Sequence, residues 1–471
     1  MQQSMWGLRF RAAFGRWTLG RSRQPSFILL AIVLAAGLWS ARTAGGAGEV
    51  KESYDDGQVK VRYRTDANDR KAGNYDEYFP SGKLKVHGTY TADKKTGTWN
   101  VYNETGKVVE TTTYRNGLLN GPYAWNFPSG KPALQTQYHQ GELSGPLIVL
   151  DERGRTVRRI SYPRSREAVE KAYNTLYKED RPPVKFAREP HVEPPYRAGA
   201  LSEETLTFAL NATKLYRYLS GVPWQELKTD PVLCEKSAHG AVVLKEIGSL
   251  THTPVKPADM DEGFFKIAYT GCHEANLFQG SSDPVAAVRG FMDDSDTTNI
   301  DRVGHRQWVL SLGLQRVGFG SAAEFVSMHV IDGSQHPAPD FSFVAFPGEG
   351  FYPRKLFEPH YAWSVHINAN KAKVGPADSI KVKLQKLDEH FQPDGDPIAA
   401  KVVSTPAAIS SAFGWSVIVF KPELTEIETV KYWVEISGVK TPTGADAPFG
   451  YLVEFIDIAA PRATDNSSKD K

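Results

Sequence analysis

Apolar and polar residues alternate along the first third of the chain, in a pattern that repeats every 24 residues. Glycine and tyrosine recur at this spacing in three separate columns, and columns that share one period indicate an internal repeat. The columns are Gly82, Gly106, Gly130 and Gly154; Gly73, Gly97, Gly121 and Gly145; and Tyr90, Tyr114, Tyr138 and Tyr162. Residues 49–163 are therefore predicted to form a repeat domain.

Each repeat has the pattern of a β-hairpin. Residues 98–103 and 108–114 flank a turn at Gly106, where glycine supplies the positive φ that a tight turn needs. Successive repeats also align their apolar positions, which predicts one apolar stripe along an extended sheet. This stripe includes Trp99, Val101, Tyr123 and Trp125.

The pattern changes after the repeats. Residues 164–200 are predicted to be a linker, with a short charged helix over residues 166–177 followed by a proline-rich stretch. Proline at this density favours extended, semi-rigid chain. The prolines are Pro182, Pro183, Pro190, Pro194 and Pro195.

Two amphipathic helices are predicted next. Ser202 is an N-cap residue for the first helix, and Gly221 ends it. The second helix has Asp230 as its cap, Pro231 at the first helical position and Gly248 as its terminator.

Alternating apolar runs return beyond residue 355, separated by turn residues. This spacing predicts a small β-sandwich of immunoglobulin-like type over residues 355–461, followed by a polar, disordered tail at 462–471. The runs are Trp363–Ile367, Ser379–Leu384, Trp415–Phe420, Tyr432–Ile436 and Tyr451–Ile456. The fold class is accordingly predicted to be multidomain α+β.

The N-terminal segment has the order of an export signal. Five arginines precede an apolar run over residues 27–39, and no acidic residue occurs before Glu49. Residues 1–48 are therefore predicted to be an export signal or a membrane anchor. The chain would be secreted or held in the periplasm or cell envelope.

Composition narrows the possible functions. With 471 residues, the chain is long enough for several domains. A formal net charge of +2 argues against a dedicated nucleic-acid surface. Only two cysteines occur, Cys234 and Cys272, which excludes a cysteine-rich zinc module. One disulfide bridge or two free thiols both remain open.

Four motifs in residues 201–350 carry a resemblance to the CAP superfamily (cysteine-rich secretory protein, antigen 5, pathogenesis-related-1; SCP-like). They are Gly248-Ser-Leu-Thr-His252, Glu274-Ala-Asn276-Leu277, Phe291-Met-Asp-Asp294 and Gly304-His305-Arg306 with the residues that follow. The Gly-His-Arg form is similar to that of bacterial members. The preceding 24-residue repeats resemble the MORN-variant family, whose members are usually scaffolds or protein-binding faces.

The resemblance implies a central α-β-α sandwich with an open cleft. Two histidines and two acidic residues of the family correspond to His252, Glu274, Asp294 and His305. Asp294 departs from the family pattern, which usually has glutamate there. Asp293 or Asp296 could take its place.

Two imidazoles and two carboxylates in one cleft have several possible roles. His252 and His305 could hold a divalent ion such as zinc, with carboxylates completing the shell. Alternatively, the groups could transfer protons, or they could form a hydrogen-bonded network that only fixes the loops.

The motifs favour a binding protein over an enzyme. The chain has neither a G-x-S-x-G nor an H-E-x-x-H motif, and so no marked nucleophile or zinc-protease site. We expect a non-enzymatic binding or scaffold protein whose ligand is a protein, a lipid or another cell-envelope component. The alternative is a metal-dependent or His/Glu-assisted hydrolase that uses His252, Glu274 and His305.

Overall fold

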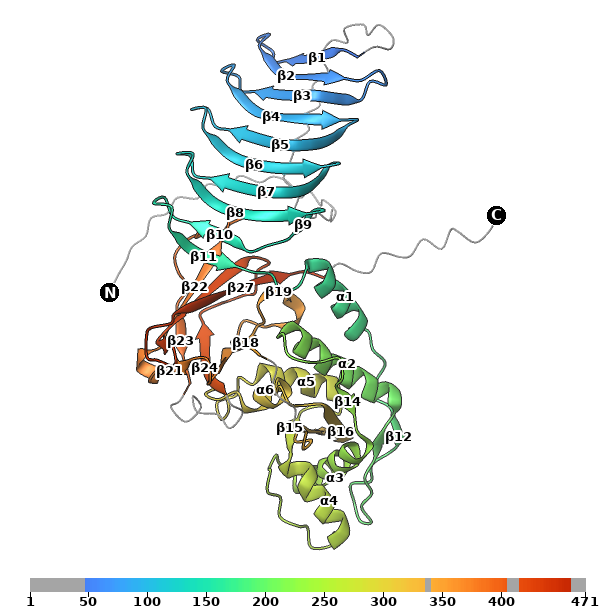
Figure 1. Ribbon diagram of the computed structural model, residues 1–471. Helices are drawn as coiled ribbons and strands as arrows, with labels where there is room; N and C mark the ends of the chain where they lie inside the picture. The colour runs from blue at the N-terminus through green and yellow to red at the C-terminus, as the bar shows by residue number, and fades with distance from the viewer. Residues whose placement is uncertain (1–46, 335–339, 405–414, 459–471) are drawn as a thin grey trace, which may run out of the picture.

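The computed structural model describes residues 47–334, 340–404 and 415–458. The predicted export segment lies almost wholly outside these ranges, as does the predicted tail at 462–471. Figure 1 shows an elongated molecule in which a tall antiparallel sheet stands on a body of helices and smaller sheets. Within the described ranges, none of the helices has the length and apolar character needed to cross a membrane.

The repeats form one antiparallel sheet of 11 strands, which confirms the predicted repeat sheet. Neighbouring strands pair in sequence order up to β8, which pairs with both β9 and β10. The strands are β1 (Glu49–Ser53), β2 (Val59–Thr65), β3 (Lys71–Tyr78), β4 (Leu84–Thr91), β5 (Lys94–Tyr102), β6 (Val108–Arg115), β7 (Leu118–Asn126), β8 (Pro132–His139), β9 (Glu142–Leu143), β10 (Leu147–Leu150) and β11 (Thr156–Ile160).

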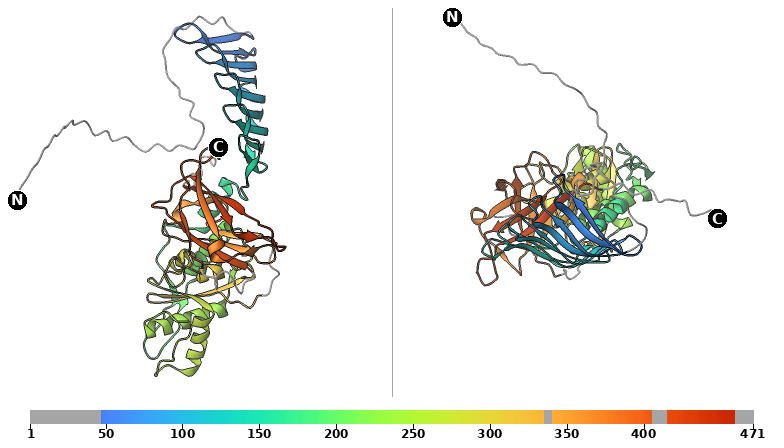
Figure 2. Two further views of the ribbon diagram at one scale, coloured as in Figure 1. Left: turned by 90° about the vertical axis from the view of Figure 1, so that its left-hand side faces the viewer. Right: turned by 90° about the horizontal axis from the view of Figure 1, so that it is seen from above.

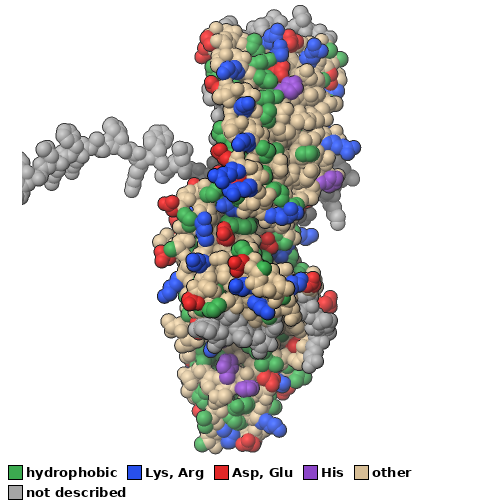
Figure 3. Space-filling view, turned by 60° about the vertical axis from the view of Figure 1, so that its left-hand side comes forward, with side chains coloured by type: hydrophobic (Ala, Val, Ile, Leu, Met, Phe, Trp, Pro, Cys, Tyr) green, Lys and Arg blue, Asp and Glu red, His purple; other side chains and the backbone are tan. Residues whose placement is uncertain are grey.

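The turn that the sequence predicts at Gly106 has a φ of 79°, which only glycine adopts without strain. Lysines occupy the same turn position in successive repeats, at Lys83, Lys107 and Lys131, and all three are exposed. Two of them donate to the next turn: Lys83 Nζ to the Glu104 carbonyl at 2.6 Å, and Lys131 Nζ to a backbone carbonyl at 3.0 Å. Basic side chains are accordingly spaced along the repeat sheet in Figure 3.

One face of the repeat sheet carries a ladder of aromatic rings. The Trp99 ring lies 5.0 Å from that of Tyr90 and 5.5 Å from that of Tyr75. Trp99 is only 4% exposed because it lies flat over Gly88, where an added Cβ would come within 2.1 Å of the indole. Lys95 Nζ lies 4.2 Å from the centre of the Trp99 ring. The aromatic and lysine side chains thus cover this face of a single-layer sheet.

The predicted linker contains α1 (Arg166–Leu176) and β12 (Phe186–Arg188), and β12 pairs with β13 (Ala200–Leu201). The two predicted helices follow as α2 (Glu203–Leu219) and α3 (Pro231–Ile247). Their predicted caps are confirmed: the Ser202 hydroxyl accepts from Thr205 N, and the Asp230 carboxylate accepts from two backbone N–H groups. Gly248 ends α3 in the left-handed conformation, with a φ of 69°.

Helices cover both faces of a central four-stranded sheet with the order β14-β16-β17-β15. Helix α3 packs on β16 at Gly318 and Gly320, where an added Cβ would come within 2.1 Å of the α3 backbone. On the opposite face, Phe319 shares a core with Leu215 of α2 and Phe291 of α5. The elements are β14 (Lys228–Thr229), α4 (Glu262–His273), β15 (Ala275–Gln279), α5 (Pro284–Asp293), α6 (Gly304–Val309), β16 (Arg316–Ala322) and β17 (Phe325–His329).

The C-terminal region consists of two four-stranded sheets, β18-β20-β24-β23 and β19-β27-β25-β22, and a small β21-β26 ladder. The strands are β18 (Phe343–Phe346), β19 (Gly350–Pro353), β20 (Trp363–Asn368), β21 (Lys373–Val374), β22 (Lys381–Leu387), β23 (Ala400–Val402), β24 (Trp415–Pro422), β25 (Lys431–Ser437), β26 (Val439–Lys440) and β27 (Phe449–Ile456), with short 3-10 helices η1 (Arg354–Leu356) and η2 (Ala377–Ser379). The immunoglobulin-like assignment stays a prediction.

The helical part and the C-terminal sheets are joined by hydrogen bonds and by a common core. Strands β18 and β19 begin within the predicted range 201–350, yet they pair with β20 and β27 of the C-terminal sheets. One hydrophobic cluster contains Leu215 of α2 together with Trp363 of β20 and Phe455 of β27. A fragment that ends at residue 350 would therefore divide this core.

The repeat sheet contacts the C-terminal sheets at its last strands. Leu134, Val149 and Ile160 pack with Trp433 and Leu452 in one apolar cluster. Above this contact the repeat sheet continues as a single layer, which the left-hand view of Figure 2 shows.

Candidate functional site

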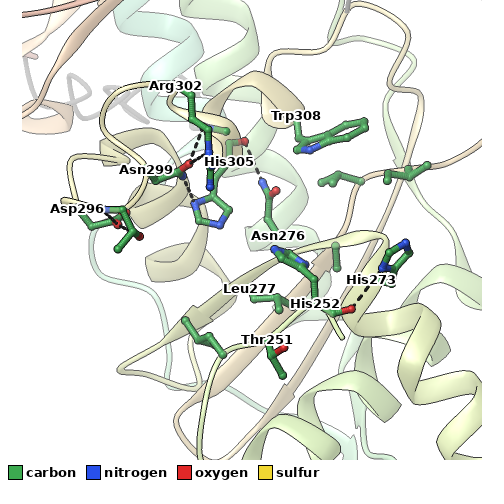
Figure 4. A pocket seen from close by; sticks show the side chains of 16 residues that line it. Thr251, His252, His273, Asn276, Leu277, Asp296, Asn299, Arg302, His305 and Trp308 are labelled. Atoms are coloured by element: carbon green, nitrogen blue, oxygen red, sulfur yellow. Dashed lines mark hydrogen bonds between the residues drawn. The ribbon is translucent and has the colours of Figure 1, made fainter. Parts of the chain in front are cut away.

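A pocket of about 610 Å³ opens beside the loop between α3 and α4, strand β15 and helix α6. Figure 4 shows the rings of His252 and His305 on either side of Asn276. The polar lining includes His252, His273, Asn276, Asn299, Arg302 and His305. The apolar lining comprises Leu250, Ala275, Leu277, Trp308, Val330 and Ile331. Both predicted histidines line this pocket, whereas Glu274 and Asp294 do not.

His252 is held by a backbone carbonyl. It lies in the loop after α3, and its Nδ1 is 2.8 Å from the carbonyl oxygen of Cys272 at the end of α4. A carbonyl oxygen only accepts, so Nδ1 carries the proton. In the neutral ring, Nε2 is then left with a lone pair.

His305 is held by a buried carboxylate. Its Nδ1 lies 2.9 Å from Asp294 Oδ1, which again places the proton on Nδ1 and the lone pair of the neutral ring on Nε2. Asn299 Nδ2 donates to the same carboxylate oxygen and lies 2.9 Å from His305 Nδ1. Gly304 N and Arg302 Nε donate to Asn299 Oδ1, which fixes the orientation of this amide.

Asp294 lies behind His305, on the side away from the pocket, and holds its ring in place. It is 3% exposed, it ends α5 in the left-handed conformation, and its second oxygen accepts from Arg306 N at 3.0 Å. The structure thus places the predicted acid behind His305 and outside the pocket lining. The other two aspartates considered have different places: Asp296 lines the pocket, and Asp293 reaches His360 at 3.3 Å.

The arginine of the Gly-His-Arg motif is structural. Arg306 is buried and donates to the carbonyls of Met292 and Asp293 and to the hydroxyl of Ser364 in β20. Burial lowers the pKa of its guanidinium to about 10. Arg306 therefore joins the end of α5 to the C-terminal sheets and fixes the segment that carries His305.

Glu274 forms a separate pair with His329. Its Oε2 lies 3.2 Å from His329 Nε2 in β17 and 3.8 Å from Lys236 Nζ in α3. Burial lowers the pKa of His329, with a further contribution from the nearby charge of Lys236. The Glu274 side chain is 35% exposed and lies outside the pocket lining, near β17 and α3.

The four predicted residues do not converge on one point that could hold a metal. Across the described ranges, no group of three or more His, Cys, Asp and Glu side chains is placed to bind one ion. Zinc sites usually need three or four protein ligands, and the two imidazoles alone do not supply them. The residues present therefore do not fit a preformed zinc site, and the zinc prediction remains to be tested.

Both cysteines are free thiols. Burial raises the pKa of the Cys272 thiol to about 12, and burial also raises that of Cys234. Both thiols are therefore protonated and unreactive at neutral pH.

Three residues that matter to the site were given no role by the sequence motifs. Asn276 is 1% exposed and donates to the His305 carbonyl at 2.9 Å, which ties β15 to α6. Asn299 orients Asp294, and His329 pairs with Glu274. Asn276 belongs to the Glu274-Ala-Asn276 motif, so the sequence could have marked it as a residue of the site. Asn299 and His329 belong to no motif.

Comparison with known proteins gives a family match for the repeats only. The family model described as "MORN repeat variant" matches residues 95–116, which confirms the MORN-variant prediction there. No curated protein matches the chain.

Two solved structures are similar to this chain, both at low identity and low TM-score. One is an extracellular protein containing an SCP domain from Bacillus anthracis str. Ames, with 12% identity, coverage of 61% of this chain and 86% of that chain, and a TM-score of 0.21. The other is a cysteine-rich secretory protein from Staphylococcus aureus subsp. aureus Mu50, with 11% identity, coverage of 57% and 84%, and a TM-score of 0.17.

Proposed function

We propose that this chain is an exported binding protein whose CAP-like part takes a small organic molecule into the 610 Å³ pocket. The observation that carries this proposal is the pair of histidines that line one pocket, each with Nδ1 fixed by a hydrogen-bond acceptor. The arginine-rich, apolar N-terminal sequence supports export.

The lining indicates the kind of ligand. In their neutral forms, His252 and His305 present Nε2 lone pairs, which accept hydrogen bonds from hydroxyl or amino groups. Trp308, Leu277 and Ile331 supply apolar surface in the same pocket. Pockets that bind small molecules usually enclose about 300–1,000 Å³ and combine apolar walls with a few fixed polar groups. The ligand would thus have paired hydroxyl or amino donors on a partly apolar body.

The contacts of Glu274 favour binding over hydrolysis. A general base must reach the reacting group, whereas the Glu274 carboxylate lies outside the pocket lining, near His329 and Lys236. The hydrolase alternative therefore stays a prediction without a supporting contact. Turnover of a peptide library that is abolished by Glu274→Ala would revive it.

The binding proposal is tested on the whole folded chain, because a fragment ending at residue 350 would divide the core. Small polar fragments are screened by protein-observed NMR against the wild type, His252→Ala and His305→Ala. The fragments that bind should share paired hydrogen-bond donors. Their affinity should fall about tenfold or more in each variant, because each variant lacks one imidazole that accepts a hydrogen bond from the fragment. His139→Ala, an exposed histidine of β8, is the matched control. Hits unaffected by both pocket variants would contradict the proposal.

Zinc is tested separately by calorimetric titration of the same proteins. Saturable binding that is lost in both His252→Ala and His305→Ala would support the zinc prediction. The absence of binding heat in the wild type would contradict it and would leave the organic-ligand proposal standing.

A further inference from the structure

A second pocket, of about 500 Å³, lies beside β23 and β24 and shares no lining residue with the first. Its polar lining consists of His360, Lys401, Lys421 and Glu423. Its remaining walls are apolar or proline residues, including Val403 and Leu424. Nothing in the proposed function of the first pocket involves this surface.

Two lysines face each other across the strands of this pocket. Lys401 of β23 and Lys421 of β24 are directly opposite in the antiparallel register. Like charges in this position repel each other and destabilise the sheet. In the part of the chain that the structure describes, no ion pair joins either lysine to a carboxylate, although the exposed Glu423 lines the same pocket.

The chain contains a second opposed lysine pair, which has its own neutralising group. Lys373 of β21 lies opposite Lys440 of β26, and Lys440 Nζ is 3.8 Å from Asp446 Oδ1. This pair lines neither the 610 Å³ pocket nor the pocket at Lys401 and Lys421. The pair at Lys401 and Lys421 therefore differs by combining a cavity with two cations that lack a carboxylate partner.

We propose that this pocket binds a small organic phosphate, with the phosphate between Lys401 and Lys421 and the organic body against the apolar wall. A phosphate monoester carries a charge of about −2 at neutral pH, which matches two ammonium groups. Lysine binds phosphate as a compact point charge. The pocket volume exceeds that of the phosphate group alone, and Val403 and Leu424 provide contacts for the organic part.

The experiment is a calorimetric titration of the full chain with phenyl phosphate at constant ionic strength. Inorganic phosphate and vesicles containing an anionic phospholipid are parallel arms, which separate a soluble monoester from the free ion and from a lipid headgroup. Phenyl phosphate should bind more tightly than inorganic phosphate because it also fills the apolar part. Lys401→Gln and Lys421→Gln should each weaken it about tenfold or more. Lys373→Gln, the matched control, should leave the affinity unchanged.

Thermal unfolding supplies an independent readout. Phenyl phosphate should raise the Tm of the wild type, because a ligand that binds only the folded state stabilises it. Without ligand, Lys401→Gln and Lys421→Gln should raise the Tm, since each removes the repulsion between opposed charges. The proposal is overturned if phenyl phosphate stabilises wild type and both variants equally, if sodium chloride reproduces the effect, or if only vesicles bind.

Discussion

Asparagine in place of Asp294 should destabilise the segment that carries His305. The wild-type carboxylate accepts from His305 Nδ1 and Asn299 Nδ2 on one oxygen and from Arg306 N on the other. An amide has one oxygen and one NH2 group. Whichever way it is turned, its NH2 group meets at least one buried donor, and that donor loses its acceptor.

The size of the effect follows from these contacts. A buried donor left without an acceptor costs about 1–3 kcal/mol, and the remaining bonds weaken because they no longer end on a charge. The negative charge near the buried Arg306 guanidinium is also removed. We expect Asp294→Asn to lower the free energy of unfolding by about 2–4 kcal/mol and to lower the Tm by several degrees.

The assay is urea unfolding followed by tryptophan fluorescence, together with a thermal scan. Asp296→Asn is the matched control: it is the same substitution two residues away, on an exposed carboxylate that accepts from Thr298 N and that an amide oxygen can replace. An Asp294→Asn protein with the urea midpoint of this control would refute the assigned hydrogen-bond network.

Three further outcomes are expected. Gly271→Ala in α4 should destabilise the chain by at least about 1–3 kcal/mol in urea unfolding, because the new Cβ would come within 1.9 Å of a backbone oxygen of α3. Gly263→Ala in the same helix should cost less, because its Cβ would meet only a side-chain oxygen of Asp261, at 3.0 Å. Burial lowers the pKa of His366 to about 3. Below pH 6.5 only the unfolded chain binds a proton at this residue, so the free energy of unfolding should fall by up to about 1.4 kcal/mol per pH unit. His366→Phe should flatten this pH dependence in thermal scans. A thiol reagent at pH 8 should leave Cys272 unmodified in the folded chain, and denaturation without reductant should release two reactive thiols per chain; a count of zero would show a disulfide.

Local features of the fold could be predicted because their causes lie within a few residues. The turn at Gly106 and the caps of α3 depend on backbone conformation and on side chains next to them in the sequence. The 24-residue period extends this to the whole repeat sheet, since each strand pairs with its neighbours in the chain. The aromatic stripe at Trp99 followed from the same alternation.

The candidate site was only half predictable because its contacts join distant segments. The motifs pointed to His252 and His305, and both line the pocket. The neighbour of Glu274 could not be found from the sequence, since His329 lies 55 residues away in β17 and comes beside Glu274 only through the pairing of β15 with β17. The position of Asp294 behind His305 depends likewise on the left-handed end of α5.

In the single-layer repeat sheet, the number of repeats sets the length of the sheet. Away from its last strands, the sheet is built from strands that pair with their sequence neighbours, so one 24-residue repeat inserted there would add two strands and lengthen the stack by about 10 Å. The contact of Leu134 and Val149 with the body would stay unchanged. The distance between the first strand and the 610 Å³ pocket is thus set by the number of repeats, and it can change by whole steps without any change in the pocket itself.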